Sequence, residues 1–277
     1  MRAALILVLT LALSASSLAD GQVQRDIVYT PPGWPQELAA DLHLPSGRGP
    51  HPAVLVIHGG GWERRTRADM ESIAARLAAR GFVAMNVSYR FAPTYLFPAQ
   101  VHDLQHAVRW LRAAAPRYDI DPKRIGAFGY SAGAHLAAML GTISDGDALD
   151  RPYGGADTRL QAVVAGGTPS DLRKFTGGRL VPQFLGAKLQ EKPELFALAS
   201  PIVHVTPGDA PMFLYHGGGD TLVDLSHAED LKRALDEAKV RAELRVVPVL
   251  GHVLTFMLAR GTEDEAMDFL AGVLARE

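Results

Sequence analysis

The chain has 277 residues, of which 48% are hydrophobic and 21% are charged, so it can bury a core and is not compositionally disordered. Its 28 Lys and Arg nearly balance 30 Asp and Glu, and the net charge of −2 argues against a nucleic-acid binder held by phosphate contacts. The absence of Cys excludes disulfides, thiolate zinc sites, iron–sulfur clusters and a cysteine nucleophile, and leaves the ten His as the main candidates for chemistry at neutral pH.

Residues 1–19 are typical of a secretory signal peptide. Arg2 precedes a short apolar run, and Ser17-Leu18-Ala19 has the small-x-small pattern of a cleavage site. A membrane anchor or a buried first helix is the alternative, but the run is shorter than the roughly 20 residues that span a bilayer. We therefore expect cleavage after Ala19, a periplasmic or secreted protein, and no stable membrane insertion.

From residue 20 onwards, short apolar runs alternate with segments of helical periodicity. We expect strands at 24–30, 38–44, 53–57, 82–88, 125–129, 160–165, 212–215 and 242–247. We expect helices at 67–79, 98–115, 134–140, 225–238 and 262–275. This alternation predicts a single α/β domain over 20–277, with a mainly parallel sheet covered by helices on both faces. Residues 169–207 fit the pattern poorly, and we expect them to form a small cap over the sheet.

The segment Gly129-Tyr130-Ser131-Ala132-Gly133 carries the strongest local signal. A Ser on a tight turn between a strand and a helix is held in a strained backbone conformation, and side chains two positions away on either side would collide. The turn also places Ser131 at a helix N-terminus, where negative charge is favoured. Such pentapeptides also occur by chance, but the apolar strand before it and the Ala-rich helix after it favour a nucleophile.

A second motif, His58-Gly59-Gly60-Gly61-Trp62, follows the strand expected at 53–57. Glycines allow backbone N–H groups to approach a ligand closely. With the N–H of Ala132, those of Gly60 and Gly61 would form an oxyanion hole, in which one donor is typically worth about 2.7–4 kcal/mol. The alternatives are a flexible loop or a phosphate cradle. For Trp62, lining a pocket and packing in the core are equally plausible, and His58 is expected to orient the loop.

A serine nucleophile needs a base and an acid that orients the base. In this architecture the chain order is Ser, then Asp or Glu, then His. Asp220 follows the strand at 212–215, whereas its competitor Asp224 suits a helix cap. His252 follows the last strand and is expected on a loop at the same sheet edge. Three other residues suit the base less well by position or chain order: His204, His216 and His227.

These motifs together resemble α/β-hydrolases. The chain is similar to secreted carboxylesterases of the acetyl-xylan/feruloyl esterase-like group and to hormone-sensitive-lipase-like esterases. Further matching segments are 88–93, 97–99 with Asp103, His216-Gly217 and Gly251-His252. The resemblance implies Ser131 as nucleophile, His252 as base and Asp220 as acid, with Gly60, Gly61 and Ala132 as amide donors. Relatives differ on whether the Trp62 amide takes part. The resemblance also implies an Arg90–Asp103 pair that holds a loop.

The expected function is hydrolysis of short-chain or aryl/acetyl esters through an acyl-enzyme, without a metal or organic cofactor. The substrate would be a small molecule or an ester linked to a polysaccharide. We assign Trp62 and Tyr130 to substrate binding. The other aromatic candidates for the pocket are Phe91, Tyr95, Phe97, Phe175 and Phe184. The alternatives are an amidase or peptidase of the same fold, a non-catalytic binding protein on a hydrolase scaffold and, as a weaker option, a lipase acting at a membrane surface.

Overall fold

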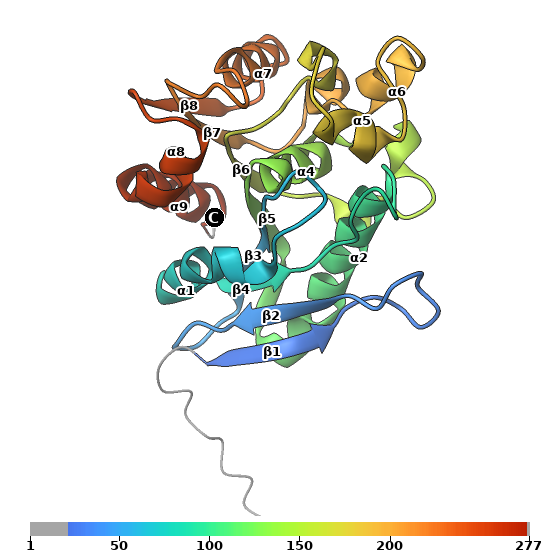
Figure 1. The fold of residues 1–277 in the computed structure, drawn as a ribbon. Coiled ribbons are helices and arrows are strands. Elements are labelled where there is room, and N and C mark those ends of the chain that lie inside the picture. Colours follow the sequence, from blue (N-terminus) through green and yellow to red (C-terminus); the bar gives the residue numbers. More distant parts are fainter. Residues whose placement is uncertain (1–21, 276–277) are drawn as a thin grey trace, which may run out of the picture.

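The computed structural model describes residues 22–275, so the predicted signal peptide lies outside the described residues. One eight-stranded sheet runs through the molecule in the order β1-β2-β4-β3-β5-β6-β7-β8 (Figure 1). Strand β2 is antiparallel to both of its neighbours, and the strands from β4 to β8 are parallel. The strands are β1 (Val23–Val28), β2 (Ala39–His43), β3 (His51–Ile57), β4 (Val83–Val87), β5 (Ile120–Tyr130), β6 (Ala162–Gly166), β7 (Met212–Gly217) and β8 (Ala242–Val247).

Helices cover both faces of the sheet, because the side chains on both faces of the central strands are buried. Along β3, Leu55 and Ile57 pack into one apolar cluster and Val54 and Val56 into another, as the two-residue period of a strand requires. Helices α2, α4 and α7 pack on the first face, and α1 and α9 on the second. The helices are α1 (Glu71–Ala79), α2 (Ala99–Ala113), α3 (Ala115–Tyr118), α4 (Ala132–Thr142), α5 (Leu180–Leu185), α6 (Pro193–Leu198), α7 (Ser226–Glu237), α8 (His252–Leu258) and α9 (Arg260–Val273).

The predicted fold class is confirmed, with differences at several boundaries. Strand β5 begins at Ile120, five residues before the predicted start, because Ile120 still pairs with His51 across an irregularity in the register. Helix α8 was not predicted. The region 169–207 contains α5, α6 and two short 3-10 helices, and lies beside α4 at the upper right of Figure 1. No helix within residues 22–275 is long and apolar enough to cross a membrane.

A buried ion pair fixes the segment that follows β4. The Asp103 carboxylate on α2 is fully buried and accepts hydrogen bonds from Arg90 Nε (2.8 and 3.0 Å), the Arg90 backbone N–H (2.9 Å) and Trp34 Nε1 (2.8 Å). Two residues further on, the Ala92 N–H donates to the carbonyl of Trp62 at 2.9 Å. The expected Arg90–Asp103 pair is therefore present, and it supports the glycine-rich loop after β3.

We expect Asp103→Ala to lower the free energy of unfolding by about 3–5 kcal/mol, because it leaves the Arg90 guanidinium buried without its counter-ion. Chemical denaturation monitored by circular dichroism measures this change. Asp268→Ala is the matched control, because the Asp268 side chain is 75% exposed and makes only a long ion pair with Arg80. Equal stability of the two variants would contradict a supporting role for the buried pair.

Candidate active site

The motifs singled out in the sequence meet at one edge of the sheet. The glycine-rich loop follows β3, Ser131 follows β5, Asp220 lies three residues after β7, and His252 follows β8. These four strands are parallel, so their carboxyl ends share an edge, where ligands bind in open α/β sheets.

Ser131 lies on a strained turn between β5 and α4. Its backbone has φ +57° and ψ −122°, and its N–H donates to the Gly166 carbonyl at 2.7 Å. A Cβ on Gly129 would lie 2.2 Å from the Gly133 carbonyl oxygen, and one on Gly133 would lie 2.1 Å from that of Ile57. Neither position accepts a side chain, which is the steric reason for the two glycines that flank Ser131.

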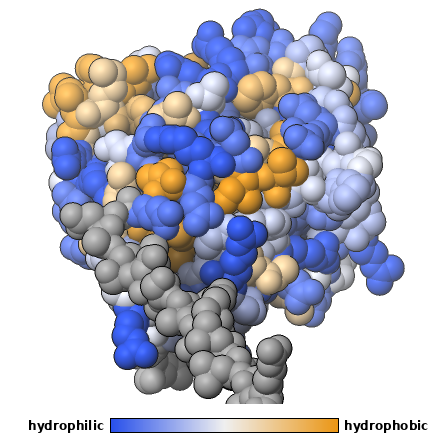
Figure 2. Space-filling model, turned by 90° about the horizontal axis from the view of Figure 1, so that it is seen from below, coloured by the Kyte–Doolittle hydropathy of each residue, from blue (hydrophilic) through white to orange (hydrophobic). Residues whose placement is uncertain are grey.

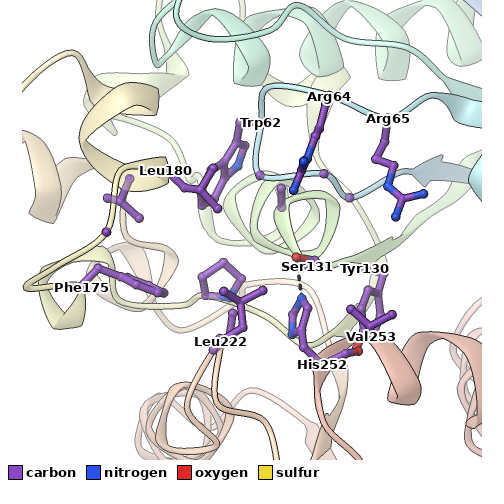
Figure 3. A pocket seen from close by; sticks show the side chains of 18 of the residues that line it. Trp62, Arg64, Arg65, Tyr130, Ser131, Phe175, Leu180, Leu222, His252 and Val253 are labelled. Carbon is purple, nitrogen blue, oxygen red and sulfur yellow. Dashed lines mark hydrogen bonds between the residues drawn. The ribbon is translucent and has the colours of Figure 1, made fainter.

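Ser131, His252 and Asp220 form one hydrogen-bonded chain, of which Figure 3 shows the bond between Ser131 and His252. His252 Nε2 is 2.8 Å from Ser131 Oγ, and His252 Nδ1 is 2.6 Å from Asp220 Oδ2. A carboxylate only accepts, so Nδ1 carries the proton, and Nε2 of the neutral ring accepts from the serine hydroxyl. Asp220 Oδ1 accepts from the N–H groups of Leu222 and Val223, both at 2.9 Å. The carboxylate is thus held by its own loop.

A second histidine also contacts the Asp220 carboxylate. His216 is fully buried, and its Nε2 lies 2.8 Å from the Val223 carbonyl and 3.4 Å from Asp220 Oδ2. Burial alone raises the pKa of Asp220, but hydrogen bonds from His216, His252 and the Val223 N–H outweigh it and hold the pKa well below the usual 3.8. The carboxylate therefore stays ionised at neutral pH.

The competing acid is placed elsewhere. Asp224 is exposed and accepts the Ser226 N–H at 2.9 Å at the start of α7. Of the other histidines, His227 is buried in α7 and binds the Asp171 N–H, and His204 contacts Asp147. Within residues 22–275, no group of three or more His, Asp or Glu side chains is arranged to hold a metal ion.

His252 opens helix α8, so the expectation that it lies on a loop was wrong. Its carbonyl accepts a hydrogen bond from the Tyr130 hydroxyl at 2.5 Å, and the two rings are 5.3 Å apart. Tyr130 is almost fully buried, so it lines the pocket with its ring while its hydroxyl fixes the start of the helix. Nothing in the sequence signalled this contact, because the two residues lie 122 positions apart.

The serine hydroxyl faces a cavity of about 320 Å³. Gly60 and Gly61 line it and have φ +112° and +62°, and a Cβ on Gly60 would lie 2.1 Å from the Arg64 carbonyl oxygen. In the described part of the chain, neither glycine N–H has a hydrogen-bond acceptor. Ala132, the first residue of α4, also lines the cavity. The predicted amide donors are thus gathered around Ser131.

Trp62 both lines the cavity and packs in the core. It is 3% exposed, stacks on Phe184 at 4.4 Å, and donates from Nε1 to His135 Nδ1 at 3.2 Å. His58 is fully buried and stacks on Tyr89 at 4.5 Å, and burial lowers its pKa to about 4. The His58 ring therefore stays neutral and supports the loop.

Part of the predicted cap forms one wall of the cavity. Phe175 and Leu180 line it (Figure 3), and Arg179 is tied to Glu63 beside the glycine-rich loop by contacts of 2.6 and 2.7 Å. Among the aromatic residues predicted for the pocket, Trp62, Tyr130 and Phe175 line this cavity. The others are not among its lining residues: Phe91, Tyr95, Phe97 and Phe184.

Several known esterases are similar to this chain. A truncated carbohydrate esterase from gut microbiota superposes with a TM-score of 0.77 and 25% identity, over 92% of this chain and 97% of that chain. Butyrate-bound esterase 2 of Thermogutta terrifontis gives 0.76 and 25%, over 93% and 96%. Esterase LipC of Mycobacterium tuberculosis is 31% identical over 198 residues, which are 67% of this chain and 48% of LipC.

The fold and the site define an α/β-hydrolase. Residues 40–235 match BD-FAE, and the chain belongs to this family. The match ends before His252, so the position of that residue rests on the structure. The chain spans about half the length of the curated relatives LipC and LipQ, at 48% and 46%.

The depressed pKa of Asp220 predicts a contribution to stability that depends on pH. Because the folded-state pKa lies below the unfolded value, the contribution is present above about pH 4 and is lost as the pH falls further. Unfolding free energies at pH 5 and pH 3 measure it, and Asp220→Asn should show a smaller loss than the wild type. An equal loss in both proteins would contradict the strong hydrogen bonding of this carboxylate.

Proposed function

We propose that the protein is a serine carboxylic-ester hydrolase that works through an acyl-enzyme. The observation that carries the proposal is the chain of hydrogen bonds from Ser131 Oγ through His252 to Asp220, facing a cavity lined by Gly60 and Gly61. A serine, a base and an acid in this relation form the constellation of acyl transfer.

In the acylation step, His252 Nε2 takes the hydroxyl proton as Ser131 Oγ attacks the ester carbonyl carbon. The carbonyl oxygen becomes an oxyanion, which the N–H groups of Gly60, Gly61 and Ala132 stabilise. Asp220 keeps the proton on His252 Nδ1 and stabilises the imidazolium. As the tetrahedral intermediate collapses, the C–O bond breaks and His252 gives its proton to the leaving alcohol.

In the deacylation step, water takes the place of the alcohol. His252 removes a proton from the water, the hydroxide oxygen attacks the acyl carbon, and the same amides hold the second oxyanion. When the bond to Ser131 Oγ breaks, His252 returns a proton to the serine, and a carboxylic acid leaves.

For the substrate, we propose esters with a short acyl chain, or aryl and acetyl esters, free or linked to a polysaccharide. A cavity of about 320 Å³ is at the small end of ligand pockets. Thermogutta terrifontis esterase 2 binds butyrate, and a carbohydrate esterase has the same fold. Residues 169–207 would act as a small cap on the single domain.

For the location, we propose export to the periplasm or medium after cleavage behind Ala19. The support is the sequence of residues 1–19, with a positive start, a short apolar run and a small-x-small end.

We expect Ser131→Ala or His252→Ala to lower kcat by about a millionfold, because the nucleophile and its base act as one unit and the loss of either removes most of the catalysis. Asp220→Asn should lower kcat about ten-thousandfold, because the tautomer of His252 is no longer fixed. Hydrolysis of p-nitrophenyl acetate gives these values, and circular dichroism checks the fold. Asp224→Asn is the matched control. If Asp224→Asn inactivated the protein while Asp220→Asn did not, the assignment of the acid would be wrong.

We expect p-nitrophenyl acetate and butyrate to have a higher kcat/KM than octanoate and longer esters, because the cavity holds only a short chain. The comparison is made at concentrations at which each ester is dissolved as single molecules. Acetylated and feruloylated sugars test the polysaccharide-linked substrates, and aminoacyl p-nitroanilides test the amidase alternative. A serine-directed phosphonate should label the wild type and leave Ser131→Ala unmodified. Turnover of amides alone would refute the esterase, and an unlabelled wild type would favour a binding protein.

A further inference from the structure

The most exposed large apolar side chains of the described residues gather beside the active site. Six of them have exposed fractions between 50% and 88%, whereas the other five on the surface reach only 37–47%. We call these six the apolar rim: Leu222, Val249, Val253, Leu254, Met257 and Leu258. Figure 2 shows an apolar group at the upper left, on the side of the molecule where Figure 1 places α8.

Helix α8 turns its apolar side to solvent. Val253, Leu254, Met257 and Leu258 are all exposed, and spacings of one and four residues place them on one helix face. The residues buried on the opposite side include His252 and Thr255. A surface helix normally buries its apolar stripe in the core. Helix α8 instead has its apolar side in solvent, and for this reason sequence periodicity did not predict it.

Val249 is held in a strained conformation with its side chain in solvent. It has φ +67°, which is unfavourable for a β-branched residue, and it is 88% exposed. The Leu250 N–H donates to the Pro248 carbonyl at 2.8 Å, which closes a three-residue turn around Val249. Neither burial nor a regular backbone accounts for a valine here, so its outward side chain points to a role on the surface.

The apolar rim is continuous with the mouth of the catalytic cavity. Leu222 and Val253 belong to both, and in Figure 3 they lie beside His252, opposite Trp62 and Arg64. A partner that docks on the rim would therefore meet the entrance to the site. A lipid surface docked there would present ester groups to Ser131.

The chemistry of the rim favours lipid over sugar or protein. All six side chains are aliphatic or thioether, without the aromatic groups and hydrogen-bond donors that recognise polar partners, and Leu and Val are under-represented at protein hot spots. Three cations line the same mouth, Arg64, Arg65 and Arg179, with side chains 71%, 62% and 65% exposed. They contact two carboxylates, those of Glu63 and Asp69, so that the cations outnumber the acids. Apolar side chains beside exposed arginines match an anionic bilayer surface.

We propose that the apolar rim docks the protein reversibly on anionic lipid bilayers, with the catalytic mouth facing the lipid. The docking goes beyond the proposed ester hydrolysis and does not depend on it.

Co-sedimentation with vesicles of equimolar diether phosphatidylglycerol and diether phosphatidylcholine tests the docking. These ether lipids contain no ester, so binding is measured apart from turnover. We expect the wild type and Ser131→Ala to bind alike, and binding to weaken on phosphatidylcholine alone. Leu254→Ser with Met257→Ser should bind at least about tenfold more weakly, because each side chain loses its transfer into an apolar phase.

The matched control is Val28→Ser with Val203→Ser, which removes two exposed valines away from the rim and should bind like the wild type. Thermal unfolding and turnover of p-nitrophenyl acetate check that the rim variant is folded and active. Absence of vesicle binding by the wild type, or equal binding by the rim variant, would overturn the docking. If the wild type did not bind vesicles and the rim variant lost self-association, the apolar rim would be an interface with a second copy of the chain instead.

Discussion

The hydrogen bond of 2.6 Å between His252 Nδ1 and Asp220 is the interaction on which the site depends. It fixes the proton on Nδ1 and leaves Nε2 free to accept from Ser131, so that one imidazole joins two strand ends that are far apart in the chain. Because a carboxylate cannot donate, the direction of every proton in the chain follows from this contact. Because the pKa of Asp220 is low, the carboxylate stays ionised at neutral pH and can only accept hydrogen bonds.

Around this contact, buried polar groups hold the loops rather than the reacting atoms. The Tyr130 hydroxyl donates to the carbonyl of His252, and His216 contacts the same oxygen of the Asp220 carboxylate that His252 binds. On the other side of Ser131, the Arg90–Asp103 pair supports the segment that binds the Trp62 carbonyl. Loops that carry chemistry are thus anchored by hydrogen bonds whose loss would leave buried groups unpaired.

The cavity and the apolar rim divide the surface around Ser131 into two environments. The cavity is small and is closed on one side by Phe175 and Leu180, and Arg179 of the same segment is bonded to Glu63. The rim lies open to solvent on α8 and at Val249. In the proposed function, a short acyl group would occupy the enclosed part, and the open part would face the surface that carries the ester. Together, the two proposals would join an esterase site for small substrates to a lipid-facing entrance.

Much of this protein was determined by the sequence itself. Gly129 and Gly133 around Ser131 are a local steric requirement, and the period of apolar residues placed most strands and helices, because both depend on near neighbours. The tie from Tyr130 to His252, the packing of Trp62 on Phe184, and helix α8 were decided only by tertiary structure. The first two join residues more than 100 positions apart. The helix exposes its apolar face, so no buried stripe marked it in the sequence.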